Sequence, residues 1–163
     1  MTILPALHRA QNVLKQNPYF VLATIDTEGP WAAALAYTWA FPGYLYFFSE
    51  LDSRHGRALA QPSQVAGVIF DSRATPDMVE SLQFSGRAEI FHTKAAIETV
   101  LTLSAKRTGA KNPSNDTINE QFMHPSTRLF RVSIESSYVL NQARFAKDGT
   151  DGREQVDTEA VFQ

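Results

Sequence analysis

The sequence predicts a mainly β protein with helical insertions, folded as a closed antiparallel barrel. Many short segments rich in β-branched and aromatic residues alternate with turn residues. Only two or three segments place their apolar residues at helical spacing. Because closing a sheet into a barrel removes its unpaired edges, a barrel suits such a series of short strands.

Length and composition indicate a single domain that does not bind nucleic acid or anionic membranes through its overall charge. The chain has 163 residues, of which 44% are hydrophobic and 20% charged, and its net charge is -2. That balance gives no footprint for nucleic acid or an anionic membrane. The absence of cysteine excludes disulfides, thiolate zinc sites and thiol nucleophiles. With no targeting segment and no run of about 20 apolar residues, we expect a cytoplasmic protein.

The first half of the chain reads as one helix followed by three strands. Apolar residues from Ile3 to Leu14 recur at helical spacing, and Pro18 ends that helix. Turn residues then separate segments of high β propensity. The third segment is apolar on both faces, which predicts a barrel interior on one side and a partner subunit on the other. The expected strands cover residues 19–25, 31–40 and 44–49.

The second half adds helices between further strands. Asp52 or Ser53 can cap a short helix that reaches about Gln61, and Thr93 can cap a longer one. A mobile loop is expected over residues 108–117, before a last short helix. Residues 1–146 are therefore predicted to form the domain, and residues 147–163 a polar, weakly ordered tail. The remaining expected strands cover residues 65–70, 79–91, 128–134 and 138–145.

The second strand has an alanine on every second position, which β propensity does not explain. Ala34 and Ala36 belong to this row, while larger residues such as Trp31 and Leu35 occupy the other face. A surface of alanines is flat and lies close to the backbone. A planar ring can bind there, and so can a helix or a partner subunit; the strand alone does not separate these alternatives.

An aromatic strand leads directly into two hydroxyls, an arginine and a histidine. Ser49 ends the strand, and Ser53, Arg54 and His55 begin the following helix. A phosphate dianion needs fixed donors of this kind, namely hydroxyls, a planar guanidinium and free backbone amides. His55 would make the interaction depend on pH near neutrality. The alternative is a capped surface helix whose charges are solvated.

This segment resembles the phosphate-binding segment of the pyridoxamine 5'-phosphate oxidase-like split barrels, which bind FMN. The similarity extends over residues 19–89 and includes the block Gln83-Phe84-Ser85-Gly86-Arg87-Ala88-Glu89. It implies a six-stranded antiparallel split β-barrel that forms a homodimer with FMN at the interface. The residues that the resemblance assigns to FMN are Ser49, Ser53, Arg54 and His55 at the phosphate, Ala34 and Ala36 by the ring, and Gln83 at its polar edge.

The C-terminal part departs from the true oxidases, because residues 138–145 lack their tryptophan and their Arg-x-His motif. We therefore expect an FMN-dependent oxidoreductase for some other small organic molecule. A non-catalytic flavin or haem carrier or sensor, and a cofactor-free dimeric module, are the alternatives. Lys106, Arg107 and Lys111 can form a basic rim for an anionic substrate or simply a solvated loop. The four histidines show no metal-ligand spacing, so no protein metal site is expected.

Overall fold

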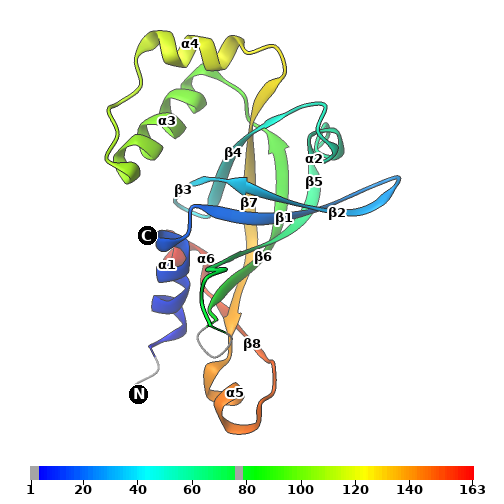
Figure 1. Cartoon of the computed structure of the whole chain (residues 1–163), viewed down its shortest axis with the longest axis vertical. Helices are drawn as coiled ribbons and strands as arrows, with labels where there is room; N and C mark the ends of the chain where they lie inside the picture. Colours follow the sequence, from blue (N-terminus) through cyan, green and yellow to red (C-terminus); the bar gives the residue numbers. More distant parts are fainter. Residues whose placement is uncertain (1–3, 76–78) are drawn as a thin grey trace.

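The computed structural model describes residues 4–75 and 79–163, and these residues form a curved antiparallel sheet flanked by helices (Figure 1). The strands are β1 (Tyr19–Asp26), β2 (Gly29–Ala36), β3 (Thr38–Ala40), β4 (Tyr44–Glu50), β5 (Ser63–Phe70), β6 (Ser81–Ile90), β7 (Thr127–Leu140) and β8 (Arg153–Val156). The helices are α1 (Ala6–Gln16), α2 (Arg54–Ala58), α3 (Lys94–Thr108), α4 (Asn115–Met123), α5 (Gln142–Asp148) and α6 (Thr158–Val161).

The strand order confirms the split-barrel prediction. The sheet runs β2-β1-β5-β6-β7-β4-β3, and β8 pairs with β7 outside this path. Its two end strands, β2 and β3, are consecutive in the chain and are separated only by Tyr37. The chain therefore passes from one end of the sheet to the other at a single residue, which curls the sheet into an incompletely closed barrel.

The strand count differs from the expected six, because the described residues form eight strands. The segment predicted as one strand over residues 31–40 is broken at Tyr37 into β2 and β3. The reverse happens near the C-terminus, where the segments expected at 128–134 and 138–145 belong to one 14-residue strand, β7, followed by α5. Pairing with β4, β6 and β8 supports β7 along its length, so its serines do not interrupt it.

The barrel interior holds the main hydrophobic core. Side chains alternate along β1, where Phe20 and Leu22 are buried while Tyr19 and Ala23 are exposed. Phe47 of β4 stacks on Phe130 of β7 with ring centroids 5.1 Å apart. This alternation divides the sheet into an inner face, which is apolar and filled, and an outer face that is partly open.

A second hydrophobic cluster covers the other face of β4. Tyr46 and Phe48 pack against residues of the α3–α4 pair, including Ile97 and Ile118. The apolar outer face of β4 was expected to meet a partner subunit; helices of the same chain pack on Tyr46 and Phe48 of this face, so these two side chains are partly buried without one. The loop between these helices is also shorter than predicted, since α3 ends at Thr108 with Gly109 as its C-cap, and Ser114 already caps α4.

The last residues differ from the polar tail expected at 147–163. β8 pairs in antiparallel fashion with the end of β7, and α6 follows it. Val161 and Phe162 are 0% and 2% exposed and belong to the barrel core. The segment is polar on average, which led to the prediction of a tail. Its few apolar residues are nevertheless spaced so that they enter the core.

Candidate functional site

The helix α2 folds tightly against the end of β4. Ser53 caps it, because its Oγ accepts a hydrogen bond from the Gly56 backbone N at 3.0 Å. A Cβ atom on Gly56 would lie 2.1 Å from the Glu50 carbonyl oxygen, so only glycine allows this approach. The strand end and the first turn of α2 are thereby held together, which positions the polar residues on both.

Three of the residues predicted to bind phosphate lie together at this junction. The Ser49 Oγ is 2.6 Å from the His55 Nε2, and the Ser53 Oγ is 3.2 Å from the same nitrogen. Burial lowers the pKa of His55, so its imidazole is neutral near pH 7. The junction therefore presents two hydroxyls and an uncharged ring around one point.

Arg54, the fourth predicted residue, lies against the β1–β2 hairpin. Its Nε donates to Asp26 Oδ2 at 2.8 Å and its Nη2 to Asp26 Oδ1 at 3.0 Å. The guanidinium carbon also lies 4.8 Å from the centroid of the Trp31 ring. The hydrogen bonds from Arg54 lower the pKa of Asp26, and Asp26 raises the pKa of Arg54. The charge on Arg54 is thus already balanced within the chain.

The acidic residues beside the cluster are turned elsewhere. The Glu50 carboxylate accepts a hydrogen bond from the Thr127 hydroxyl at 2.6 Å. Hydrogen bonds from Ser126 and Thr127 lower the pKa of Glu50. Asp52 is exposed. None of the hydrogen bonds found among the described residues joins a carboxylate to Ser49, Ser53 or His55, so neither neighbour occupies the junction.

The residues predicted at the flavin ring share the outer face of the sheet. Strand register aligns Ala34 with Val21, Val21 with Val68, and Val68 with Gln83 in one transverse row. Ala34 and Ala36 are exposed on that face. Two strands separate Ala34 from Gln83, which corresponds to about 14 Å. The Gln83 Oε1 accepts a hydrogen bond from the Arg153 Nε of β8 at 2.7 Å.

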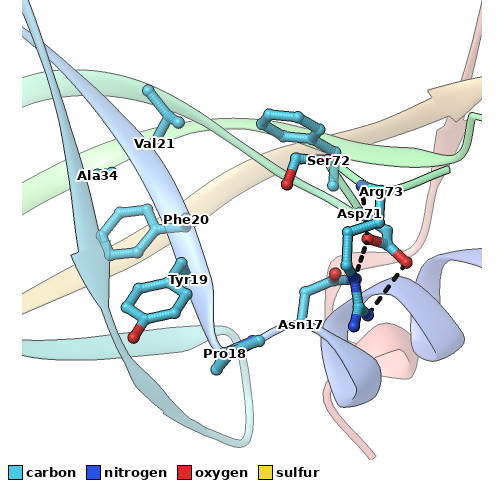
Figure 2. Close-up of a pocket in the computed structure, with 10 residues that line it drawn as sticks. Asn17, Pro18, Tyr19, Phe20, Val21, Ala34, Asp71, Ser72 and Arg73 are labelled. Atoms are coloured by element: carbon cyan, nitrogen blue, oxygen red, sulfur yellow. Dashed lines mark hydrogen bonds and ion pairs between the residues drawn. The ribbon is translucent and has the colours of Figure 1, made fainter.

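A cavity of about 480 Å³ opens on the outer face beside Ala34. Figure 2 shows Tyr19 and Ala34 on one side of it and the Asp71–Arg73 ion pair on the other. The Arg73 side chain in this pair is 85% exposed. The space is therefore lined mainly by apolar side chains with charged groups at its rim, a composition common in small-molecule sites.

A second cavity, of about 300 Å³, adjoins the first at Asn17 and Pro18. It is lined by Lys15 and by Arg107, whose guanidinium carbon lies 3.8 Å from the centroid of the Trp39 ring. Arg107 donates to the Thr38 hydroxyl and to the Trp39 carbonyl. Within the described part of the chain, no carboxylate forms an ion pair with Arg107. Arg107 lies in the last turn of α3 and is exposed, and these contacts hold its cationic guanidinium against β3.

Residues 4–75 and 79–163 contain no group of three or more His, Asp or Glu residues arranged to hold a metal ion. No helix formed by these residues is long and apolar enough to cross a membrane.

The fold and the junction at α2 define a split-barrel protein with a candidate site for a phosphorylated ligand. The sequence profile of the family described as Pyridoxamine 5'-phosphate oxidase matches residues 6–141. The chain belongs to this family.

Individual relatives are more distant. UPF0306 protein PM1958 of Pasteurella multocida is 29% identical over 89 residues, which are 53% of this chain and 60% of that protein. The match therefore spans less than two thirds of this curated relative. The crystal structure of conserved hypothetical protein Rv2991 from Mycobacterium tuberculosis is similar with a TM-score of 0.68 and 21% identity, over 84% of this chain and 85% of that one.

A haem protein has the same fold. HutZ, the haem storage protein from Vibrio cholerae, is similar with a TM-score of 0.64 and 18% identity, over 81% of this chain and 92% of that one. Likeness at this level of identity extends to the fold alone.

Sequence reasoning missed two partners of the predicted residues. Asp26 binds Arg54 across 28 positions of the chain, and Arg153 binds Gln83 across 70. An aspartate before a turn was visible in the sequence, but it reads equally well as a turn residue, and it does act as one here. Arg153 lay in the segment expected to be a tail, and no sequence signal linked it to Gln83.

Proposed function

We propose that this chain binds FMN, with the phosphate at Ser49, Ser53 and His55 beside Arg54 and the ring over the alanines of β2. The observation that carries this proposal is the junction itself. Two hydroxyls lie within 3.2 Å of the His55 Nε2 at the start of α2, and the Glu50 carboxylate is bound by Thr127 instead. These groups fit a phosphate ester, since no carboxylate among the described residues hydrogen-bonds to them. The Ser53 hydroxyl, which donates to the Glu50 carbonyl oxygen at 2.7 Å, would turn toward the phosphate when FMN binds.

The outer face of β2 suits the ring. Ala34 and Ala36 leave the backbone accessible, and the cavity beside Ala34 gives a planar group apolar surroundings. Gln83 lies in the same transverse row as Ala34, and its amide can pair with a polar edge. Because two strands lie between them, Gln83 is too far from Ala34 to touch a group centred on Ala34. We therefore assign Gln83 to the far end of the flavin ring or to the flavin ring of a second FMN.

The proposed activity is oxidoreduction of a small organic molecule. Bound FMN supplies the hydride or electron chemistry, and the protein binds the flavin, orients it and shields it. We place an anionic substrate in the adjoining cavity, where Lys15 and Arg107 provide positive charge and Trp39 an aromatic surface. The two cavities share Asn17 and Pro18, so ligands bound in them would be neighbours.

We propose a homodimer joined through the outer face of the β1–β2–β5 region. Large apolar side chains are exposed there, with Tyr19 61%, Ile25 71% and Phe70 39% exposed. Together with the alanine row, on which the FMN ring would lie between the two subunits, they form a surface whose burial would be favourable. Sedimentation equilibrium should give twice the mass of the 18.2 kDa chain; a monomer at micromolar concentration would contradict the dimer.

A non-catalytic carrier or sensor is the second candidate, and the structural likeness to the haem storage protein HutZ supports it. An absorption spectrum of the protein purified without added cofactor separates the cases. A flavin band supports the first proposal, and a Soret band supports haem. Turnover with a reduced nicotinamide and an electron acceptor then distinguishes an enzyme from a flavin carrier.

The phosphate contact has a direct test. FMN and riboflavin differ only in the phosphate, so flavin fluorescence titrations with both report on that group. Arg54→Ala should weaken FMN binding about 10- to 100-fold, the range of one charge-assisted contact, and should leave riboflavin binding unchanged. Equal affinity of the wild-type chain for FMN and riboflavin would remove the phosphate from the site.

A further inference from the structure

We propose that Asp26 is an internal competitor of the phosphate group for Arg54, and so sets how tightly this site binds a phosphorylated ligand. The inference rests on the proposed function, because it concerns the same site. Asp26 is not among the binding residues predicted from the sequence. Its role follows from the position of its carboxylate in the structure.

The carboxylate occupies the Nε/Nη2 edge of Arg54, one of the two edges by which a guanidinium binds a phosphate in a bidentate manner. Its two oxygens accept from Nε and Nη2 at 2.8 and 3.0 Å. This is the fork geometry that guanidinium groups use for carboxylates and phosphates alike. Among the described residues no hydrogen bond involves Nη1. A phosphate at Arg54 must therefore either displace Asp26 from the Nε/Nη2 edge, or accept from Nη1 and the second N–H of Nη2 while the carboxylate remains beside it on the same guanidinium.

Asp26 is held in this position by its own turn. Its Oδ1 accepts a second hydrogen bond, from the Glu28 backbone N at 2.8 Å. Gly29 completes the turn with a φ of 107°, a conformation that favours glycine. The Asp26 and Arg54 side chains are 20% and 22% exposed, so the pair is mostly shielded from water. A carboxylate fixed in this way stays close to any anion that approaches Arg54.

Arg54 does not depend on Asp26 alone for its position. Its guanidinium also lies over the Trp31 ring at 4.8 Å, and Nη2 lies 3.4 Å from the Gly29 carbonyl oxygen. These contacts with neutral groups remain when the carboxylate is replaced by an amide. Removing the negative charge should therefore free the guanidinium for a phosphate rather than misplace it. This consideration fixes the sign of the expected effect.

The test measures FMN and riboflavin affinities of Asp26→Asn by flavin fluorescence. We expect FMN to bind about tenfold more tightly than to the wild-type chain, the effect of removing one competing contact, with riboflavin affinity unchanged. Glu28→Gln is the matched control, since it removes the same charge from the same turn, and the Glu28 side chain acts on Arg54 through charge alone, with no hydrogen bond found between them. It should change FMN affinity by less than about twofold.

Two further variants keep the test decisive. Asp26→Ser replaces Asp26→Asn if thermal melting shows that Asp26→Asn is poorly folded. It retains a side-chain oxygen for the Glu28 amide, and it should also tighten FMN binding. Adding Arg54→Ala to Asp26→Asn should abolish the gain. Unchanged or weaker FMN binding by Asp26→Asn and Asp26→Ser, alongside a loss in Arg54→Ala, would overturn the competition and leave the phosphate site intact. No effect of Arg54→Ala would instead overturn the phosphate contact itself.

Discussion

The two tryptophans of the β2–β3 segment each have an arginine over their ring, and the two arginines differ in their counter-charge. Arg54 lies over Trp31 and is bound on two nitrogens by Asp26. Arg107 lies over Trp39, and within residues 4–75 and 79–163 it donates only to a hydroxyl and a carbonyl. The same residue type on the same kind of surface is therefore neutralised at one end of the segment and left charged at the other.

The difference shows that the identity of a cation does not determine whether it is available to a ligand. Burial without a carboxylate lowers the pKa of Arg107, whereas hydrogen bonds to Asp26 raise the pKa of Arg54. Both side chains remain cationic at neutral pH. A ligand anion has to compete for Arg54, while at Arg107 it would meet an uncompensated charge in a cavity.

The largest expected effect comes from removing Phe162, the aromatic side chain that packs against Trp39. Phe162 packs edge to face against Trp39 at 5.9 Å and is 2% exposed. Phe162→Ala should lower the free energy of unfolding by about 3–5 kcal/mol, as expected for a large buried aromatic. Urea denaturation measures this. Phe145→Ala, which removes the same side chain from an exposed position of α5, should cost less than about 1 kcal/mol. Equal costs would mean that the last residues do not belong to the core.

The sequence predicted the elements that have a strong local signal. The alternation in β1, the proline after α1 and the cap of α2 each depend on neighbouring residues. The first two are where they were expected, and Ser53 is the cap of the two candidates, Asp52 and Ser53. The convergence of Ser49, Ser53 and His55 also follows from local order, because a strand end and a helix start bring them together.

What the sequence did not predict depends on contacts between distant parts of the chain. The Asp26–Arg54 pair joins a hairpin to a helix, and the α3–α4 pair covers the face of β4 that seemed to need a partner. Phe162 enters the core from a segment whose composition is that of a tail. In each case the local pattern was compatible with two environments, and tertiary packing determined which one was realised.

A smaller loss of stability is expected when Arg107 is replaced, and it can be measured on the protein without a ligand. Arg107→Gln removes a cation stacked on Trp39 and its hydrogen bonds to Thr38 and the Trp39 carbonyl. The loss should be about 1–2 kcal/mol in the free energy of unfolding. Lys106→Gln is the matched control, because it makes the same charge change one position earlier on a side chain that is also exposed and for which no hydrogen bond or cation–π contact is found among the described residues. If both variants are equally stable, Arg107 is solvated and the contrast with Arg54 disappears.

The smallest effect concerns pH and belongs to His55 rather than to either arginine. Burial lowers the pKa of His55, so near pH 7 the ring is neutral in the free protein, and a bound phosphate dianion would favour its protonated form. FMN binding should therefore take up a fraction of a proton and tighten by about two- to threefold between roughly pH 8 and pH 7. Calorimetry in buffers of different ionisation enthalpy measures this uptake, and His55→Gln should abolish it.

The folding stability of the free protein should respond to pH in the opposite direction. Because the pKa of His55 is lower in the folded chain than its ordinary value of about 6.5, the unfolded chain binds the proton more readily. The stability that neutral His55 retains above about pH 6.5 is lost as the pH falls below that value, and His55→Gln should remove this part of the pH dependence. Arg54 stays charged throughout the range, since Asp26 raises its pKa. If FMN binding still tightens at lower pH in the His55→Gln variant, the group that titrates is neither His55 nor Arg54 and lies outside the junction.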